Sequence, residues 1–95
     1  MHGMVFAQPG LDGHADNNII TGNQIKNTLS LGTDAILLVM LDSLPNHGYM
    51  LNATIKGNSI THFTNALTGK INSVIVPLPE GTYITGVFAP NSVHP

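Results

Sequence analysis

The stretch Ile71–Phe88, INSVIVPLPEGTYITGVF, constrains the fold more than any other part of the chain. It holds two apolar runs on either side of the tripeptide Pro79-Glu80-Gly81. Proline presets φ for a turn, and glycine accepts the positive φ that a tight reversal often needs. The pattern therefore predicts a β-hairpin or a corner, with Pro79, Gly81 and Tyr83 as its structural residues.

Other short apolar runs, separated by turn formers, predict strands elsewhere. Ala35–Leu41, AILLVML, is the most hydrophobic run and predicts a central strand. Tyr49–Ile55 and Ser59–Phe63 alternate apolar and polar residues as half-buried strands do. Ile19–Leu31 predicts two strand fragments with a kink between them, at Gly22-Asn23.

The remaining segments add no helix to this pattern. Thr64–Gly69 predicts a polar loop, in which NALTG could form one helical turn, and no segment of the chain keeps a helical period over three turns. Strands at short, regular spacings are typical of a β-sandwich. We therefore predict an all-β fold, namely an Ig-like, Greek-key β-sandwich of about seven short strands.

The composition of the chain is poor in charge. Charged residues make up 8% of the 95 residues, compared with about 25% in an average globular domain. Apolar residues reach 42%, unlike a disordered chain, which is rich in charge and poor in apolar residues. Because the centres of subunit interfaces also contain few charges, the composition indicates a domain that assembles as a homo-oligomer or homopolymer.

Charge and cysteine usage exclude several partners. The few basic residues (Lys26, Lys56 and Lys70) and the net charge of −2 argue against nucleic acid. No apolar run is long enough for membrane insertion, and the N-terminus lacks the pattern of a secretion signal. Without cysteine there is neither a disulfide nor a thiolate metal site. We expect an extracellular, cell-surface or virion location, and a cytoplasmic one stays open.

Residues 1–18 predict an N-terminal arm that precedes a sandwich domain of residues 19–95. The final APNSVHP disfavours a strand because of Pro90 and Pro95, which would leave a sheet edge uncovered. An apolar run in the arm could cover such an edge, either in its own chain or in a neighbouring subunit. In the second case the run is the assembly interface; it consists of Met4, Val5, Phe6 and Ala7.

The segment LNATIKGNSITHFTNALTGKINSVIVPLPEGTYITGVFAPN, which begins at Leu51, resembles the second half of bacterial and archaeal Ig-like or transthyretin-like (prealbumin-type) surface repeats. The shared features are the NATIKGN turn, the T-N-x-x-T-G-K step and the L-P-x-G-x-Y corner that starts at Leu78. The preceding TLSLGTDAILLVMLDSLPN is similar to the opening strands of the same repeats. The resemblance implies a stalk, adhesin, surface-layer or virion decoration module.

Two short segments carry candidate site residues. Asp12, His14 and Asp16 place oxygen and imidazole groups two residues apart, which weakly resembles a calcium loop. The bidentate glutamate of such a loop is missing, so a turn rich in Asp and Asn is the favoured interpretation. Asn52 begins the glycosylation sequon Asn-Ala-Thr, which matters only in an exported protein.

The chain carries no recognisable catalytic pattern. Its five histidines show no zinc-ligand spacing, and no G-x-S-x-G nucleophile motif is present. No glycine-rich loop opens a helix, so phosphate binding has no support. We expect that the protein is not an enzyme and needs no cofactor.

Two functions remain after these exclusions. The first is a self-assembling structural protein, as a filament, surface-layer or virion coat subunit, which fits the scarce charge and the apolar arm. The second is an adhesin or carbohydrate-binding module. Glycan sites usually present flat aromatic rings, and this chain has no Trp, two Tyr and three Phe. The sequence therefore favours the first function.

Overall fold

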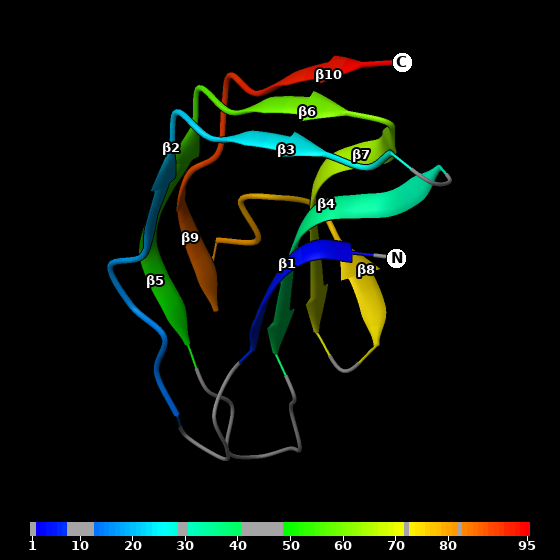
Figure 1. Ribbon diagram of the computed structural model, residues 1–95. Coiled ribbons are helices and arrows are strands. Elements are labelled where there is room, and N and C mark those ends of the chain that lie inside the picture. The colour runs from blue at the N-terminus through cyan, green and yellow to red at the C-terminus, as the bar shows by residue number, and fades with distance from the viewer. Residues whose placement is uncertain (1, 8–12, 29–30, 41–48, 72, 82) are drawn as a thin grey trace.

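The computed structural model describes residues 2–7, 13–28, 31–40, 49–71, 73–81 and 83–95 (Figure 1). Within these ranges the protein is all-β, as predicted, and contains no helix, hence none that could cross a membrane. The strands are β1 (His2–Ala7), β2 (Ile19–Thr21), β3 (Gln24–Lys26), β4 (Gly32–Met40), β5 (Met50–Lys56), β6 (Ser59–Thr61), β7 (Phe63–Ile71), β8 (Val74–Val76), β9 (Ile84–Val87) and β10 (Ser92–His94).

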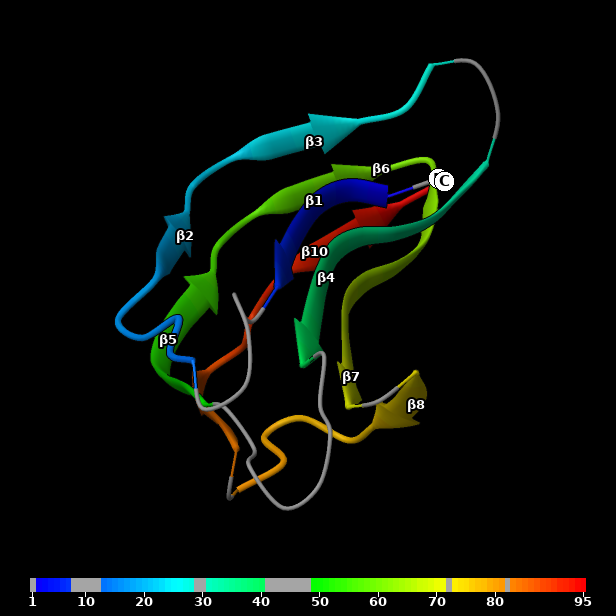
Figure 2. The ribbon, with the colours of Figure 1, turned by 90° about the horizontal axis from the view of Figure 1, so that it is seen from below.

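These strands form three sheets. The first sheet has the order β1-β4-β7-β8, the second β2-β5-β9 and the third β3-β6-β10. Every neighbouring pair is parallel except β7 and β8. The chain thus visits the three sheets in turn and repeats the circuit, so that each circuit stacks on the one before (Figures 1 and 2). This is a parallel β-helix, or β-solenoid.

Three coils of the solenoid are described. The first coil contains β1, β2 and β3, the second β4, β5 and β6, and the third β7, β9 and β10, with β8 as an added strand. The sheets surround one core, in which equivalent positions of successive coils stack. Ile25, Ile60 and Val93 form one such stack across the third sheet. Ile20 pairs with Ile55 in the second sheet.

The corner between the second and third sheets has the same local sequence in the first two coils. Gly22 and Gly57 have φ values of 67° and 68°, in the left-handed region that glycine adopts without steric cost. Each is followed by an asparagine and then by an apolar position that faces the core, Ile25 or Ile60. The predicted kink at Gly22-Asn23 is confirmed as this corner.

The predicted Ig-like sandwich is not the arrangement that these strands adopt. A Greek-key sandwich packs two antiparallel sheets face to face, whereas here three small sheets of mainly parallel strands enclose the core. Apolar alternation indicates a strand and its buried face but does not reveal which strand it pairs with. Of the predicted central strand Ala35–Leu41, residues 35–40 lie in β4, which is flanked by β1 and β7, and Leu41 lies outside the described residues.

Three local predictions were wrong. Thr64–Gly69 is part of β7 rather than a loop, and Ser92–His94 forms β10 despite the neighbouring prolines. The apolar run after Ile71 is a separate strand, β8, which folds back antiparallel on β7. Pro79–Gly81 is therefore a corner between β8 and β9, one of the two forms predicted for it. For β7 and β10, pairing with a strand of the preceding coil decided the outcome, and local sequence patterns do not reveal that pairing.

The buried face of β5 also differs from strict alternation. Met50, Ala53 and Ile55 are buried, whereas alternation from Tyr49 would place Met50 and Ala53 on opposite faces. Asn52 has a φ of 61°, and the register with β9 shifts between Met50 and Ala53. The positive φ rotates the strand at this point and turns both side chains into the core.

Candidate functional site

Among the described residues, no other coil lies on the outer side of the third coil. Val93 occupies the same stack as the fully buried Ile60 yet is 47% exposed, because no coil covers it among the described residues. β8 pairs only with residues 69–71 of β7. The outer edge of residues 63–68 of β7 therefore has no partner strand among the described residues. The open end therefore presents both apolar side chains and unpaired backbone groups.

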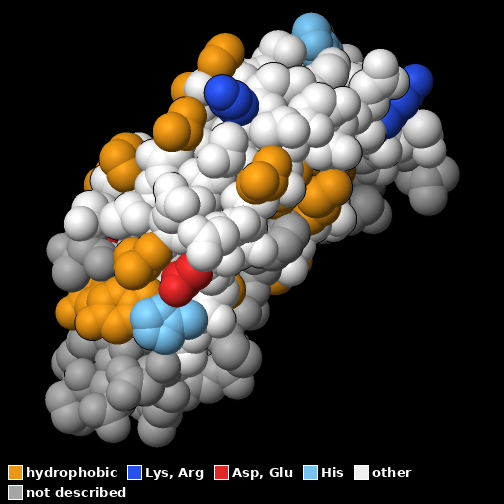
Figure 3. Space-filling view, turned by 90° about the vertical axis from the view of Figure 1, so that its left-hand side faces the viewer, with side chains coloured by type: hydrophobic (Ala, Val, Ile, Leu, Met, Phe, Trp, Pro, Cys, Tyr) orange, Lys and Arg blue, Asp and Glu red, His pale blue; other side chains and the backbone are white. Residues whose placement is uncertain are grey.

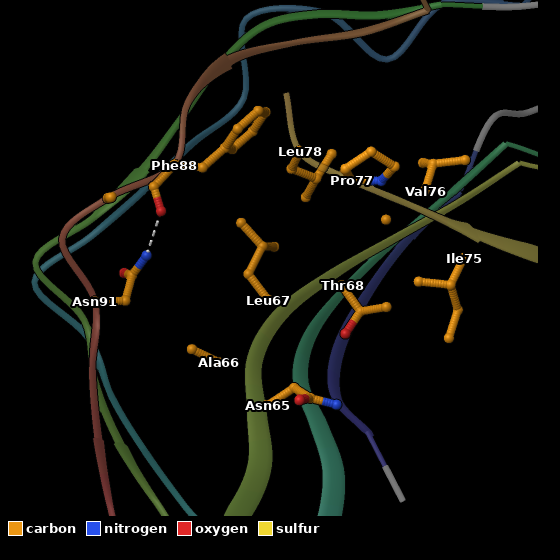
Figure 4. Close-up of a pocket in the computed structure, with 12 residues that line it drawn as sticks. Asn65, Ala66, Leu67, Thr68, Ile75, Val76, Pro77, Leu78, Phe88 and Asn91 are labelled. Atoms are coloured by element: carbon orange, nitrogen blue, oxygen red, sulfur yellow. Dashed lines mark hydrogen bonds between the residues drawn. The ribbon is translucent and has the colours of Figure 1, made fainter. Parts of the chain in front are cut away.

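A hollow of about 650 Å³ lies at this open end. Leu67, Leu78 and Phe88 contribute side chains to it, from β7, from the segment after β8 and from the residue after β9 (Figure 4). Asn65 and Thr68 also line it along β7, and Asn91 lies on the opposite side.

An asparagine ladder runs through the corner beside this hollow. Asn58 is 1% exposed, and its Oδ1 accepts hydrogen bonds from the backbone N–H and Nδ2 of Asn23 at 3.0 and 3.1 Å. Its own Nδ2 donates to the carbonyl of Ile20 at 3.0 Å and to Oδ1 of Asn91 at 2.8 Å. The ladder thus ties the three described coils together through a buried, satisfied amide.

A second set of contacts joins rings from the three coils, of which His14 and Tyr49 are stacked and Tyr49 and Tyr83 are tilted. His14 and Tyr49 have ring centroids 5.1 Å apart at an interplanar angle of 25°. Tyr49 and Tyr83 follow at 5.7 Å and 40°. Beside them, Nδ2 of Asn52 donates to Oδ1 of Asn17 at 2.9 Å. Aromatic and amide groups are thus repeated along the solenoid axis.

The predicted metal candidates come together only in part. Nδ1 of His14 lies 2.8 Å from Oδ2 of Asp16, and Oδ1 of Asp16 accepts from the N–H of Leu51 at 2.8 Å. The bond from Leu51 lowers the pKa of Asp16, desolvation opposes this effect, and the hydrogen bond and charge of His14 lower the pKa further. Asp12 lies outside the described residues. Within the described part of the chain, no three His, Asp or Glu side chains form a metal-binding group.

Asp34 is a buried carboxylate that the sequence analysis did not single out as a site. It is 2% exposed and accepts from Thr68 Oγ1 at 2.5 Å and from Asn65 Nδ2 at 3.1 Å. Nδ1 of His2 lies 3.3 Å from its other oxygen. These contacts join β1, β4 and β7, so the group holds the first sheet together rather than facing a ligand.

The remaining predicted residues have clear positions. Met4, Val5, Phe6 and Ala7 lie in β1 and pair with Ile36, Leu37, Leu38 and Val39 of β4 in the same chain. Residues 1–18 therefore contribute β1 to the first coil.

The other two predictions are the glycosylation sequon and the structural corner. Asn52 is exposed and binds Asn17 through the amide nitrogen that a glycan would occupy. At the corner, Gly81 has a φ of 94°, and Glu80 Oε2 accepts from the N–H of Tyr83 at 2.9 Å. Pro79 is exposed at the same corner.

Sequence reasoning missed the ladder, although a signal for it exists. The motif N-x-x-I-x-G-N-x-I occurs at Asn17–Ile25 and again at Asn52–Ile60. The ladder asparagines are 35 residues apart between the first two coils and 33 between the last two. Repeats of this length are the sequence signature of a solenoid. A search for internal repeats before strand assignment would have found it.

Comparison with known proteins adds no relative: no family model, no curated protein and no solved structure matches this chain.

Proposed function

We propose that this chain is a self-assembling structural protein, in which the solenoid of one copy continues into the next. The observation that carries the proposal is the open third coil, where Val93, Phe88 and Leu67 line an uncovered core beside an unpaired strand edge. Solenoids need polar terminal caps to stay soluble as single units, and uncovered strand edges template further pairing.

The surface composition supports assembly as well. Charged side chains are sparse on the face shown in Figure 3, and hydrophobic side chains are scattered along it. Several large apolar residues are exposed, including Ile19, Val74 and Ile75. With a net charge of −2, copies of the chain repel one another little. A filament, surface-layer or virion coat subunit at an extracellular, cell-surface or virion location is the function we propose.

The test compares two valine variants on the third coil. Val93→Lys puts a charge into the open core stack, whereas Val87→Lys makes the same change on the outward face of β9, where Val87 is 53% exposed. Sedimentation velocity across a concentration series and negative-stain electron microscopy should show axial assemblies for the wild type and for V87K, and monomers for V93K. A wild-type protein that stays monomeric up to millimolar concentration would contradict the proposal.

A glycan-binding module is the second candidate, and the stack of His14, Tyr49 and Tyr83 is the observation that favours it. Aromatic faces pack against the apolar face of a sugar ring, and the amides of Asn17 and Asn52 lie nearby as hydrogen-bonding groups. A glycan array with wild type and Tyr49→Ala tests it. Binding that is lost in Y49A supports this function, and an array without any signal removes it.

A further inference from the structure

The asparagine ladder has a direction. In each step the backbone N–H and Nδ2 of one coil donate to Oδ1 of the asparagine in the next coil, as Asn23 does to Asn58 and Asn58 to Asn91. In the reverse direction, the residue that follows the asparagine in the chain donates its N–H to the backbone carbonyl of the asparagine one coil earlier. Ser59 donates to Asn23 at 2.8 Å, and Ser92 donates to Asn58 at 3.0 Å. A ladder of this kind ends in donors on one side and in an acceptor on the other.

The two ends of the ladder are therefore complementary. At the third coil, Nδ2 of Asn91 keeps the bond to the preceding coil, to Ile55 O at 3.1 Å, but otherwise turns back to Phe88 O in its own coil at 2.8 Å (Figure 4). Its backbone N–H meets no acceptor among the described residues. At the first coil, Oδ1 of Asn23 accepts no hydrogen bond from the residues that the structure describes.

We propose that the ladder continues between copies, so that Asn91 of one copy donates through its N–H and Nδ2 to Oδ1 of Asn23 in the next copy. This inference rests on the proposed function and deepens it, because it fixes the polarity and register of assembly. The N–H of Gln24 then binds the carbonyl of Asn91 in the adjoining copy, as Ser59 and Ser92 bind theirs within one chain.

The apolar positions match in the same register. Ile25 of the incoming copy covers Val93, because Ile25, Ile60 and Val93 form one stack. Ile20 of the incoming copy covers Phe88 in the same way. Within the chain Ile20 pairs with Ile55, and Val87, next to Phe88, pairs with Thr54, next to Ile55, so Phe88 is equivalent to Ile20 in the second sheet. The first coil of this chain thus supplies an asparagine and two isoleucines at the spacing that the third coil requires, and for this reason we assign the occupant as a second copy.

Strand β8 limits the junction in the first sheet. Leu38 pairs with Phe6 on one side and with Gly69 on the other, so an incoming β1 in this register would place Phe6 opposite Gly69, where Val76 of β8 already pairs. The junction therefore covers the second and third sheets and Phe63–Thr68 of β7, and it stops at β8. Pro90 also has no N–H to donate to the next coil. Both features make the junction weaker than a contact between coils of one chain.

This contact joins two different surfaces and continues the solenoid along its own axis, so it repeats without closing into a ring and produces a polar filament. Asn23→Ala removes the acceptor end and Asn91→Ala the donor end. Asn17→Gly is the matched control, since it removes an amide that links the same two coils as Asn23 on the outer surface, at a position whose φ of 61° glycine adopts without strain. Loss of the amide bonds should raise the critical concentration of N23A and N91A by about tenfold, while N17G should assemble like the wild type.

Mixing the variants separates a blocked interface from a misfolded chain. An equimolar mixture of N23A and N91A retains one intact junction, between Asn91 of the first variant and Asn23 of the second. It should give dimers by sedimentation velocity but no filaments, and each variant alone should stay monomeric with a β-sheet circular dichroism spectrum. Wild-type assembly with unchanged critical concentrations in both variants, or without dimers in the mixture, overturns the ladder junction and leaves the proposed function standing. A wild type that never assembles overturns the proposed function itself.

Discussion

The second and third coils carry similar residues at three equivalent positions, but at these positions only the residues of the second coil are fully buried. Ile36, Ile55 and Ile60 of the second coil are fully buried. The corresponding residues of the third coil, Leu67, Phe88 and Val93, are half-buried or exposed. At these three positions the difference follows from stacking, because among the described residues the second coil has a coil on both sides and the third coil has one on a single side.

The largest expected effect compares one stack in the two coils. Ile60→Ala should lower the free energy of unfolding by about 3 kcal/mol, because it opens a cavity between covered neighbours. Val93→Ala, at the exposed end of the same stack, should cost well below about 1 kcal/mol. Urea denaturation monitored by circular dichroism under monomeric conditions measures both. Equal losses in the two variants would mean that the third coil is covered in solution.

The ladder predicts the next largest difference. Asn58→Ala should cost about 2 kcal/mol, because it leaves the N–H of Asn23 and the carbonyl of Ile20 without partners in the interior. Asn91→Ala should cost about half as much, since its bonds lie at the wetter end of the ladder. Thermal unfolding of the two variants at one dilute concentration provides the comparison. A larger loss for N91A would contradict the view that the middle coil carries the ladder.

The smallest expected effect concerns the contact of the first coil with the second on the outer surface. The pKa of Asp16 is held below its ordinary value of 3.8 by the N–H of Leu51, so this bond contributes stability above pH 3.8. The contribution is lost as the pH falls through the lower, folded-state pKa. Asp16→Asn should therefore melt slightly below the wild type at pH 7, and the two melting temperatures should converge toward pH 2. A difference that persists at pH 2 would show that the carboxylate charge is not the cause.

The sequence determined the class of local structure. The apolar run of β4, the kink at Gly22-Asn23 and the reversal around Pro79–Gly81 are all recognisable because propensity and turn chemistry act over a few residues. The composition likewise indicated a protein with few charges to keep copies apart. The positions of β4 and β5 followed from these features, because turn formers lie on both sides of each run.

Tertiary structure decided the partners of the strands and the position of the site. β7 and β10 formed against the predictions because a parallel partner about one coil earlier satisfied their backbones, at a sequence distance that local patterns do not reach. The asparagine ladder is written in the sequence as a repeat, but its ends become donor and acceptor only when the coils stack. Hydrogen bonding between distant segments, and not local propensity, therefore defines both the fold and the surface that we propose for assembly.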